Sequence, residues 1–468
     1  MYRYNTERYS SRLSRFFYGI FAVTSLFCLL EIRPTFGSPV KNLTPILSQL
    51  ETHIQNYVQK KRIPGCAVAI VYQNQIVFMH TYGVKTLGKN EKIDLDTIFQ
   101  LGSVSKPMAA TLASILEHKG LLRLDDPVNY YLPTFSLKSV QSPSILKIKH
   151  VLSHSTGVPR AGFNNLIESH APYSSIVHAL QNTPVRTAVG KRYDYNNAMF
   201  SLISEITHAA TLLSFPDALR LNLLKPLNMS RTSSSLDALL KTPNRASPHT
   251  RDRRGMLIPC DTYSKGYYTV APAGGINSSI RDMAIFLKAQ LGGYPQVLNH
   301  RILTRIHTPQ IITNNNVLSP YEGPPHLIKN ARYGLGWRMV DFANHKMVFH
   351  GGWLKGFTNF IAFIPEQQVG IVVLHNGDSR FSSKTAVKFL EMFMEVPKQR
   401  MHIIHKKTPI LQRRSSVQQE MLHLRKRKIL KPIERPKQAQ SKILPPRQTI
   451  TVIQKPKPIH TKPKAKAR

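Results

Sequence analysis

Ser103-Val104-Ser105-Lys106 opens a segment in which apolar residues recur at helical spacing, and this pattern predicts a helix that ends near Gly120. A serine and a lysine three residues apart lie on one face of a helix. We therefore expect the Lys106 amine close enough to take a proton from the Ser103 hydroxyl. That hydroxyl would also lie at the positive end of the helix dipole. The stretch predicts a nucleophilic serine for acyl transfer.

The same stretch has a second interpretation, in which Ser103 is a helix N-cap and Lys106 a solvated side chain. The S-x-x-K pattern is weakly specific, because it occurs again at 38–41 and at 144–147. Neither of these two matches opens a long amphipathic helix. The choice between the two interpretations therefore depends on the rest of the chain.

Two later stretches favour the nucleophile. Tyr195-Asn196-Asn197 and His350-Gly351-Gly352 follow the first stretch in this order. Together the three stretches resemble the signatures of penicillin-recognising serine hydrolases. The Y-x-N form of the second stretch resembles the class C β-lactamase branch of that superfamily. The same branch also holds D-alanyl-D-alanine peptidases, D-aminopeptidases and serine esterases.

The resemblance extends beyond the three motifs, from about residue 63 to about residue 396. Five more segments are similar to the family in sequence and in order: Leu152–Val158, Pro226–Met229, Ala271–Ile276, Tyr333–Trp337 and Val372–Asn376. Many ordered matches are more specific than any one motif. They identify the chain as a member of this superfamily.

The resemblance implies a catalytic role for three residues. Ser103 is the nucleophile, and Lys106 and Tyr195 are the two candidate bases. The two bases should titrate as a coupled unit, and the sequence leaves open which of them takes the proton. Asn197 is the residue that orients the acyl side chain of the substrate.

The resemblance also implies how the transition state is held. The backbone N–H groups of Ser103 and Trp353 form the oxyanion hole, where each donor typically contributes on the order of 100- to 1,000-fold in rate. Gly351 and Gly352 let the substrate backbone approach the strand edge closely.

His350 is the departure from the pattern of classical β-lactamases, which carry a lysine there in K-T-G. A lysine ammonium holds a substrate carboxylate at all working pH values, whereas an imidazole does so only when it is protonated. A histidine at this position resembles the peptidase and esterase members. We expect His350 either to contact the substrate or only to hydrogen-bond Tyr195 or Ser103.

The fold class follows from the two ends of this region. Apolar, β-branched runs at 66–72 and 75–82 predict a hairpin, and 347–349, 358–364 and 368–374 predict three more strands. Helices are predicted near 46–60 and 383–396. The expected fold is α/β: one antiparallel sheet flanked by terminal helices, with a large inserted helical subdomain from about 104 to 330. The resemblance implies the same arrangement, with the site in the cleft between the two parts.

Charge and hydropathy divide the 468-residue chain into three parts. Arginines followed by the apolar run 16–30 predict a signal peptide, or an uncleaved membrane anchor, over residues 1–37. Residues 41–397 form the hydrolase domain. Residues 398–468 hold 21 Lys and Arg against 2 Asp and Glu, which is +19 of the formal net charge of +39. Such a basic, proline-rich tail is expected to be mostly disordered.

The leading hypothesis is an exported serine hydrolase, β-lactamase class C-like, that acts through an acyl-enzyme on an amide or ester carbonyl. Its alternatives are a D-Ala-D-Ala carboxypeptidase, a D-aminopeptidase or an esterase, and then a non-catalytic scaffold on the cell wall. We expect a small-molecule or muropeptide-like acyl substrate, no cofactor, no metal and no specific nucleic acid. The expected location is the periplasm, with the tail on an anionic membrane or cell-wall surface or without any specific partner.

Overall fold

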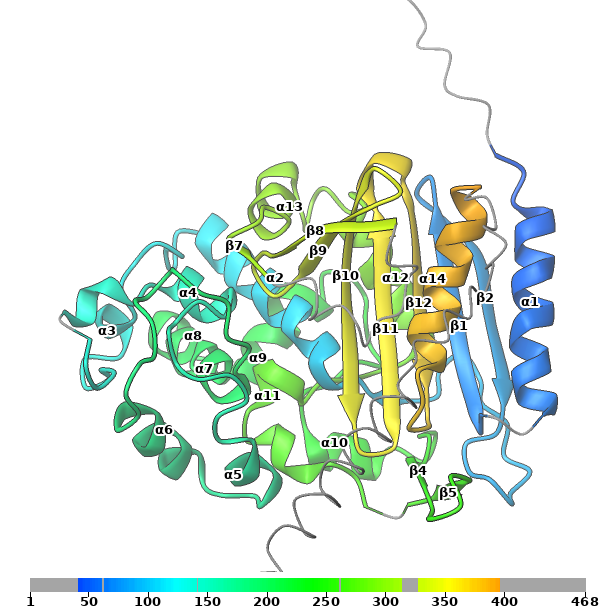
Figure 1. Cartoon of the computed structure of the whole chain (residues 1–468), viewed down its shortest axis with the longest axis horizontal. Coiled ribbons are helices and arrows are strands. Elements are labelled where there is room, and N and C mark those ends of the chain that lie inside the picture. Colours follow the sequence, from blue (N-terminus) through cyan, green and yellow to red (C-terminus); the bar gives the residue numbers. More distant parts are fainter. Residues whose placement is uncertain (1–40, 61–62, 141, 261, 314–326, 396–468) are drawn as a thin grey trace, which may run out of the picture. The chain divides into compact units, whose positions relative to one another are not determined.

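A computed structural model describes residues 41–395 of the chain, apart from 61–62, 141, 261 and 314–326. The segments interpreted as a signal peptide or anchor and as a basic tail therefore lie outside the described residues. Figure 1 shows the described part as a large sheet with helices against both faces and a mostly helical region beside it.

The sheet has eight antiparallel strands in the order β2-β1-β12-β11-β10-β9-β8-β7 within the described residues. Consequently the first and last long strands of the domain are neighbours, with Cys66 opposite His375. The strands are β1 (Gly65–Tyr72), β2 (Gln75–Gly83), β7 (Ile311–Ile312), β8 (Ile328–Tyr333), β9 (Arg338–Phe342), β10 (His345–Leu354), β11 (Phe357–Ile364) and β12 (Val369–His375).

The predicted fold class is confirmed. All five strands expected from the sequence are present. β10 is longer than expected at both ends, and at its C-terminal end it continues through its two glycines. The short strands β7, β8 and β9 of this sheet were missed. β8 has a register irregularity and a residue at positive φ, Asn330, so its burial does not alternate as in a regular strand.

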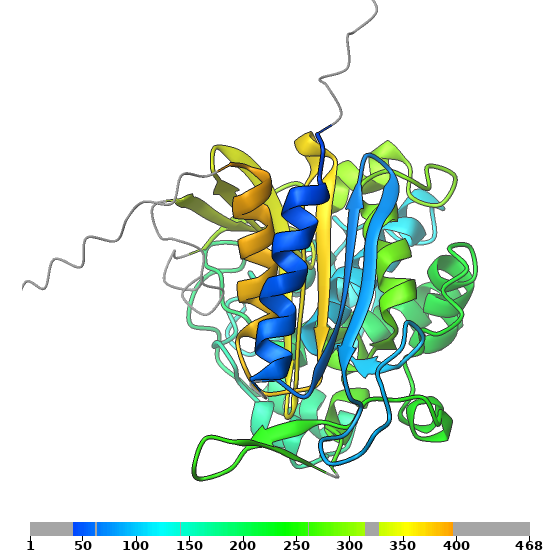
Figure 2. The ribbon, with the colours of Figure 1, turned by 90° about the vertical axis from the view of Figure 1, so that its right-hand side faces the viewer.

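Each face of the sheet supports one hydrophobic core, because side chains alternate between the faces of a strand. Val68 and Ile70 of β1 pack with α1 (Thr44–Gln59) and α14 (Phe381–Phe393). Ala67 and Ala69 belong to the other core, which includes α2 (Ser105–His118) and α12 (Ile280–Gln290). Figure 2 shows α1 and α14 side by side over one face of the sheet.

Between α2 and β8, the described part of the chain consists of helices and connecting loops, and the strands described there are two or three residues long. Its helices are α3 (Val128–Tyr131), α4 (Ile148–Leu152), α5 (Asn164–Glu168), α6 (Tyr173–Gln181), α7 (Asn197–Ser201), α8 (Ile203–Thr211), α9 (Phe215–Leu219), α10 (Leu236–Lys241), α11 (Ala271–Gly274), α12 and α13 (His300–Ile306). The strands are β3 (Phe99–Gln100), β4 (His249–Arg251), β5 (Leu257–Pro259) and β6 (Asn277–Ser278), besides β7.

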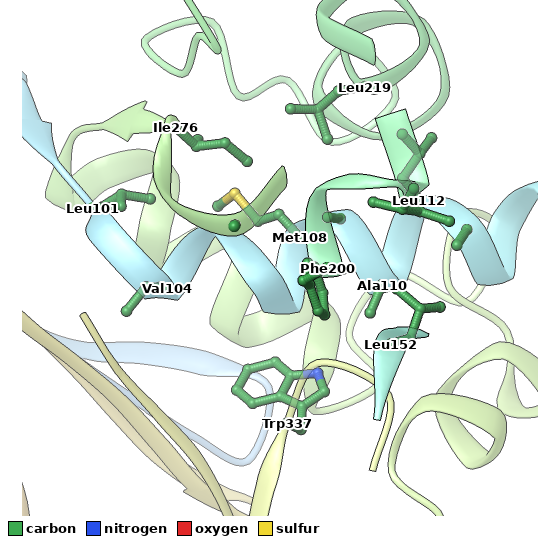
Figure 3. Packing of buried hydrophobic residues seen from close by; sticks show 14 of the residues in the cluster. Leu101, Val104, Met108, Ala110, Leu112, Leu152, Phe200, Leu219, Ile276 and Trp337 are labelled. Atoms are coloured by element: carbon green, nitrogen blue, oxygen red, sulfur yellow. The ribbon is translucent and has the colours of Figure 1, made fainter. Parts of the chain in front are cut away.

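Helix α2 is the central element of the core that includes Ala67 and Ala69. Twelve of its fourteen residues are buried, from Ser105 to Leu116. Figure 3 shows Met108 and Leu112 of this helix together with Leu152, Phe200 and Trp337 from other parts of the chain. A helix buried on all sides holds its first turn in a fixed position. That turn carries the predicted base Lys106, and the predicted nucleophile Ser103 lies directly before it.

The two ends of the described domain are tied together. The Lys41 ammonium forms an ion pair with Glu395 at 2.9 Å and also donates to the backbone carbonyl of Phe393. Residues of α1 and α14 pack in the same core.

Within the described residues, no single helix is both long and apolar enough to cross a membrane. The helices at Asn197–Thr211 and Phe215–Leu224, bent by 76°, meet that criterion only as a pair.

Candidate active site

Ser103 lies in a short 3-10 turn, η1 (Gly102–Val104), directly before α2. The helix therefore begins two residues later than expected. No side chain caps it, so Ser103 is not an N-cap. The Ser103 side chain is half-buried, and its Oγ lies 3.2 Å from Lys106 Nζ and 2.7 Å from the Tyr195 hydroxyl. The structure thus brings the predicted nucleophile and both predicted bases together.

Lys106 is completely buried, and three oxygen atoms surround its amine. Besides Ser103 Oγ, these are Asn197 Oδ1 and the backbone oxygen of Ala273, each at 2.7 Å. Burial, reinforced by the positive charge of Arg338, lowers the pKa of Lys106 well below its ordinary value. The surroundings therefore favour the neutral amine.

A neutral amine has two N–H donors and one lone pair. The Asn197 and Ala273 oxygens can only accept, so they take the two N–H groups of Lys106. The lone pair then faces Ser103 Oγ, the third neighbour. An ammonium at Lys106 would donate to all three oxygens, Ser103 Oγ included. Only the neutral amine has a lone pair that can take the Ser103 proton.

Tyr195 approaches Ser103 from the segment before α7. Its hydroxyl donates to Ser103 Oγ, and the Lys106 amine nitrogen lies 4.6 Å from the centre of its ring. The ring packs on His154 at 4.3 Å, whose Nδ1 accepts from the backbone N–H of Asn196. Burial lowers the pKa of His154, so this imidazole is neutral and supports the tyrosine without adding charge.

Asn197 is buried, and both ends of its amide are engaged within the protein. Oδ1 accepts from Lys106, while Nδ2 donates to Asn164 Oδ1 at 3.1 Å. One N–H of the amide is left to meet a substrate. Asn164, on α5 (Asn164–Glu168), was not singled out from the sequence, and only the fold shows that it bonds to the Asn197 amide.

The Trp353 backbone lies beside the turn that carries Ser103. A side chain on Gly102 would place its Cβ 3.0 Å from the Trp353 oxygen and 3.1 Å from the Trp353 nitrogen. In a strand, the N–H and C=O of one residue point to the same side. Both Trp353 groups therefore face the Ser103 turn, as an oxyanion hole requires. The indole is 55% exposed and donates to Asp378.

Gly352 of β10 makes a close contact that we did not expect. A Cβ on Gly352 would lie 2.0 Å from the backbone oxygen of Leu101, so its missing side chain admits the chain leading to Ser103 rather than the substrate. The pairing of β10 with β9 ends at Phe349. From Gly351 onward, β10 is therefore an edge toward the cleft in the described part of the chain.

His350 is fully buried, and its two ring nitrogens bond to groups other than Tyr195 and Ser103. Its Nδ1 lies 2.8 Å from the Gly351 carbonyl, so this nitrogen carries the proton, and Nε2 accepts from the Tyr333 hydroxyl at 3.1 Å. Burial and the neighbouring cations Arg338 and Lys106 lower its pKa well below the ordinary value. In this structure the ring is neutral and has no surface for a substrate.

Arg338 is the charged residue that the sequence did not reveal. It begins β9, is 6% exposed, and its guanidinium carbon lies 5.5 Å from the centre of the Tyr195 ring. Its only sequence signal is its place directly after Tyr333–Trp337, one of the family-like segments.

Other features near the site complete the description. A cavity of about 480 Å³ adjoins Gly351, Gly352 and Trp353, and β11 together with the start of α14 forms its other walls; Ser103 does not line it. Within the described residues, no three His, Cys, Asp or Glu side chains gather as metal ligands.

Comparison with known proteins agrees with this geometry. Residues 50–390 match the family described as Beta-lactamase. Protein flp of Staphylococcus aureus (strain NCTC 8325 / PS 47) is 26% identical over 342 residues, covering 72% of this chain and 64% of that protein. A Beta-lactamase of Escherichia coli (strain K12) is 24% identical over 374 residues, covering 73% of this chain and 90% of that protein. The chain thus spans just under two thirds of the flp proteins.

A solved structure, the octameric penicillin-binding protein homologue from Pyrococcus abyssi, has a similar fold. The TM-score is 0.66 with 24% sequence identity, over 75% of this chain and 77% of that one. At this identity the likeness shows the fold alone.

Proposed function

Since this chain belongs to the beta-lactamase family, whose members are typically serine hydrolases, we propose that Ser103 attacks an amide or ester carbonyl and carries the acyl group as a covalent intermediate. The observation that supports this most directly is the position of Ser103 Oγ. It lies within hydrogen-bond distance of the buried Lys106 amine and of the Tyr195 hydroxyl, beside the Trp353 backbone.

In the proposed acylation, the Ser103 proton passes to the lone pair of Lys106 while Oγ forms a bond to the carbonyl carbon. The negative charge that develops on the carbonyl oxygen is stabilised by the backbone N–H groups of Ser103 and Trp353. When the intermediate collapses, the bond to the leaving amine or alkoxide breaks. Tyr195 gives its proton to that group and becomes a phenolate.

Deacylation reverses these transfers. The Tyr195 phenolate takes a proton from water, and the resulting hydroxide attacks the acyl carbon. Ser103 Oγ leaves and takes the proton from Lys106, so both bases regain their starting states. This division assigns acylation to Lys106 and deacylation to Tyr195, which the sequence had left open.

Covalent labelling tests the nucleophile. Ser103→Ala should abolish labelling by a fluorophosphonate or a fluorescent penicillin, measured by intact-protein mass spectrometry. Ser144→Ala is the matched control, because Ser144 belongs to another S-x-x-K match and is exposed; its labelling should equal that of the wild type. Labelling that persists in Ser103→Ala would refute the assignment, and a wild type that no probe acylates would instead favour the non-catalytic scaffold.

For the substrate, the neutral and buried His350 favours an esterase or a D-aminopeptidase, whose acyl donors need no free carboxylate, over an efficient lactamase or a D-Ala-D-Ala carboxypeptidase. The K-T-G position here supplies no cation to hold a carboxylate. We therefore expect neutral acyl esters or amides to be hydrolysed faster than matched compounds with a free carboxylate. Measuring kcat/KM for a short acyl ester, a D-Ala-D-Ala peptide and a cephalosporin would rank them, and a strong preference for the carboxylates would contradict the expectation.

We also propose export to the periplasm and attachment of the tail to an anionic membrane or cell-wall surface. The support is compositional: the apolar run at 16–30 and the net charge of +19 over residues 398–468. Deleting 398–468 should release the protein from the envelope fraction without changing turnover. Unchanged association would reject the role of the tail.

A further inference from the structure

Arg338 is held among aromatic rings at the back of the site. Its guanidinium carbon lies 5.5 Å from the centre of the Tyr195 ring, 5.7 Å from that of Tyr333 and 6.0 Å from that of Tyr193. The side chain is only 6% exposed, so it does not form the wall that a substrate meets. A guanidinium keeps its charge at every working pH.

Several titratable groups surround Arg338 and Tyr195. They come from α2, the segment after α4, the segment before α7, β8 and β10, and they are Lys106, His154, Tyr193, Tyr333 and His350. One carboxylate, Asp194, belongs to the same segment as Tyr193 and Tyr195, and it pairs with Arg192 at 3.3 Å.

Unlike Lys106, His154 and His350, Arg338 carries a charge that does not titrate. Burial favours the neutral forms of Lys106, His154 and His350, and Arg338 is a further cause of the lowered pKa of each of the three. The two hydrogen bonds of His350 already fix it as a neutral ring. The permanent positive charge next to Tyr195 therefore comes from β9 and not from the K-T-G position of β10.

We propose that Arg338 is a positioning residue that stabilises the Tyr195 phenolate of the acyl-enzyme, and that it supplies the fixed charge which His350 does not. This inference rests on the proposed function, in which Tyr195 loses its proton to the leaving group and regains one from water. Without the charge of Arg338, both protons of the Lys106–Tyr195 unit are held more tightly.

The test is the pH profile of acylation in three variants. The reactive form has Lys106 neutral and Tyr195 protonated, so the profile is bell-shaped. Removing a nearby positive charge favours proton binding at every neighbouring group, so Arg338→Gln should move both limbs to higher pH. With about 6 Å between the Arg338 charge and the titrating groups, we expect each limb of the profile to shift by roughly one pH unit or more. On the acid limb this is a change of about tenfold in rate at a given pH.

Arg338→Lys keeps the charge and should restore both limbs to within about half a pH unit of the wild type. Arg332→Gln is the matched control, since Arg332 lies on the neighbouring strand β8 and pairs with Asp341 at 3.2 Å. Its profile should match that of the wild type. An unshifted profile in Arg338→Gln would overturn the proposal, and so would an equal shift in Arg338→Lys, because shape rather than charge would then be responsible.

A second readout needs no substrate. Subtracting the tyrosinate absorbance of Tyr195→Phe from that of the wild type gives the titration curve of Tyr195 alone. The midpoint of this curve should move to higher pH in Arg338→Gln but not in Arg332→Gln. If the wild type is never acylated but this titration moves, the proposed function fails while the charge effect stands. If acylation is normal and the titration does not move, only the inference about Arg338 fails.

Discussion

Replacing Gly352 by alanine tests how the oxyanion hole is assembled. The added Cβ would lie 2.0 Å from the Leu101 oxygen and 3.2 Å from a Val104 methyl group, and ordinary contact begins near 3.4 Å. Relief of the first contact therefore requires β10 and the Ser103 turn to separate by about 1.4 Å. That separation would move the N–H of Trp353 away from the N–H of Ser103.

The size of the effect follows from the geometry of the hole. Oxyanion donors act at 2.7–3.1 Å, so a displacement of this size removes one donor, and the acylation rate should fall roughly 100- to 1,000-fold. Overpacking of a buried backbone contact should also lower the free energy of unfolding by about 1–3 kcal/mol. We expect the rate to change far more than the folding does.

The assay is the second-order rate of acylation by a fluorophosphonate, normalised to the folded fraction from circular dichroism. Gly120→Ala is the control for stability. Gly120 has a φ of +74°, and an added Cβ would have no heavy atom within 4 Å, so its alanine variant should lose about 1 kcal/mol through backbone strain alone and keep the wild-type rate. A Gly352→Ala protein that is acylated within about threefold of the wild type, with native melting, would refute this account of the hole.

Two further predictions concern the surroundings of the site. Asn164→Ala should lower kcat/KM roughly tenfold, because the Asn197 amide loses the partner that orients it; the exposed neighbour in Asn165→Ala should have no effect, and equal losses in both would argue against the contact. Burial lowers the pKa of His307 to about 3 from 6.5, so the unfolded chain binds the extra proton below pH 6.5 and stability falls as the pH falls. Between pH 7 and pH 3, the wild type should lose roughly 4 kcal/mol more of its free energy of unfolding than His307→Gln loses. Equal losses in the two proteins, measured by chemical denaturation at each pH, would contradict this.

The long strands and the terminal helices could be predicted from the sequence because their signal is local. The runs of β1, β2, β11 and β12 are apolar and β-branched over seven or more residues, which a helix would not require. β9 was missed because five residues that start with a buried arginine do not give such a signal.

The candidate site was only partly predictable. Ser103 and Lys106 meet because they are one helical turn apart, which the sequence states directly. Tyr195 could be paired with them only through the family resemblance, since 92 residues separate it from Ser103. The burial of His350 and the position of Arg338 beside Tyr195 depend on how distant segments of the chain pack against one another. The spacing of residues in the sequence carries no information about that packing.

The ion pair between Lys41 and Glu395 has a consequence for how the hydrolase is presented. The pair holds the first and last residues of the described domain next to each other. The described domain therefore begins and ends at one place in its fold. Exchanging either flank, or inserting the whole domain into a loop of another protein, should therefore leave the catalytic geometry as it is.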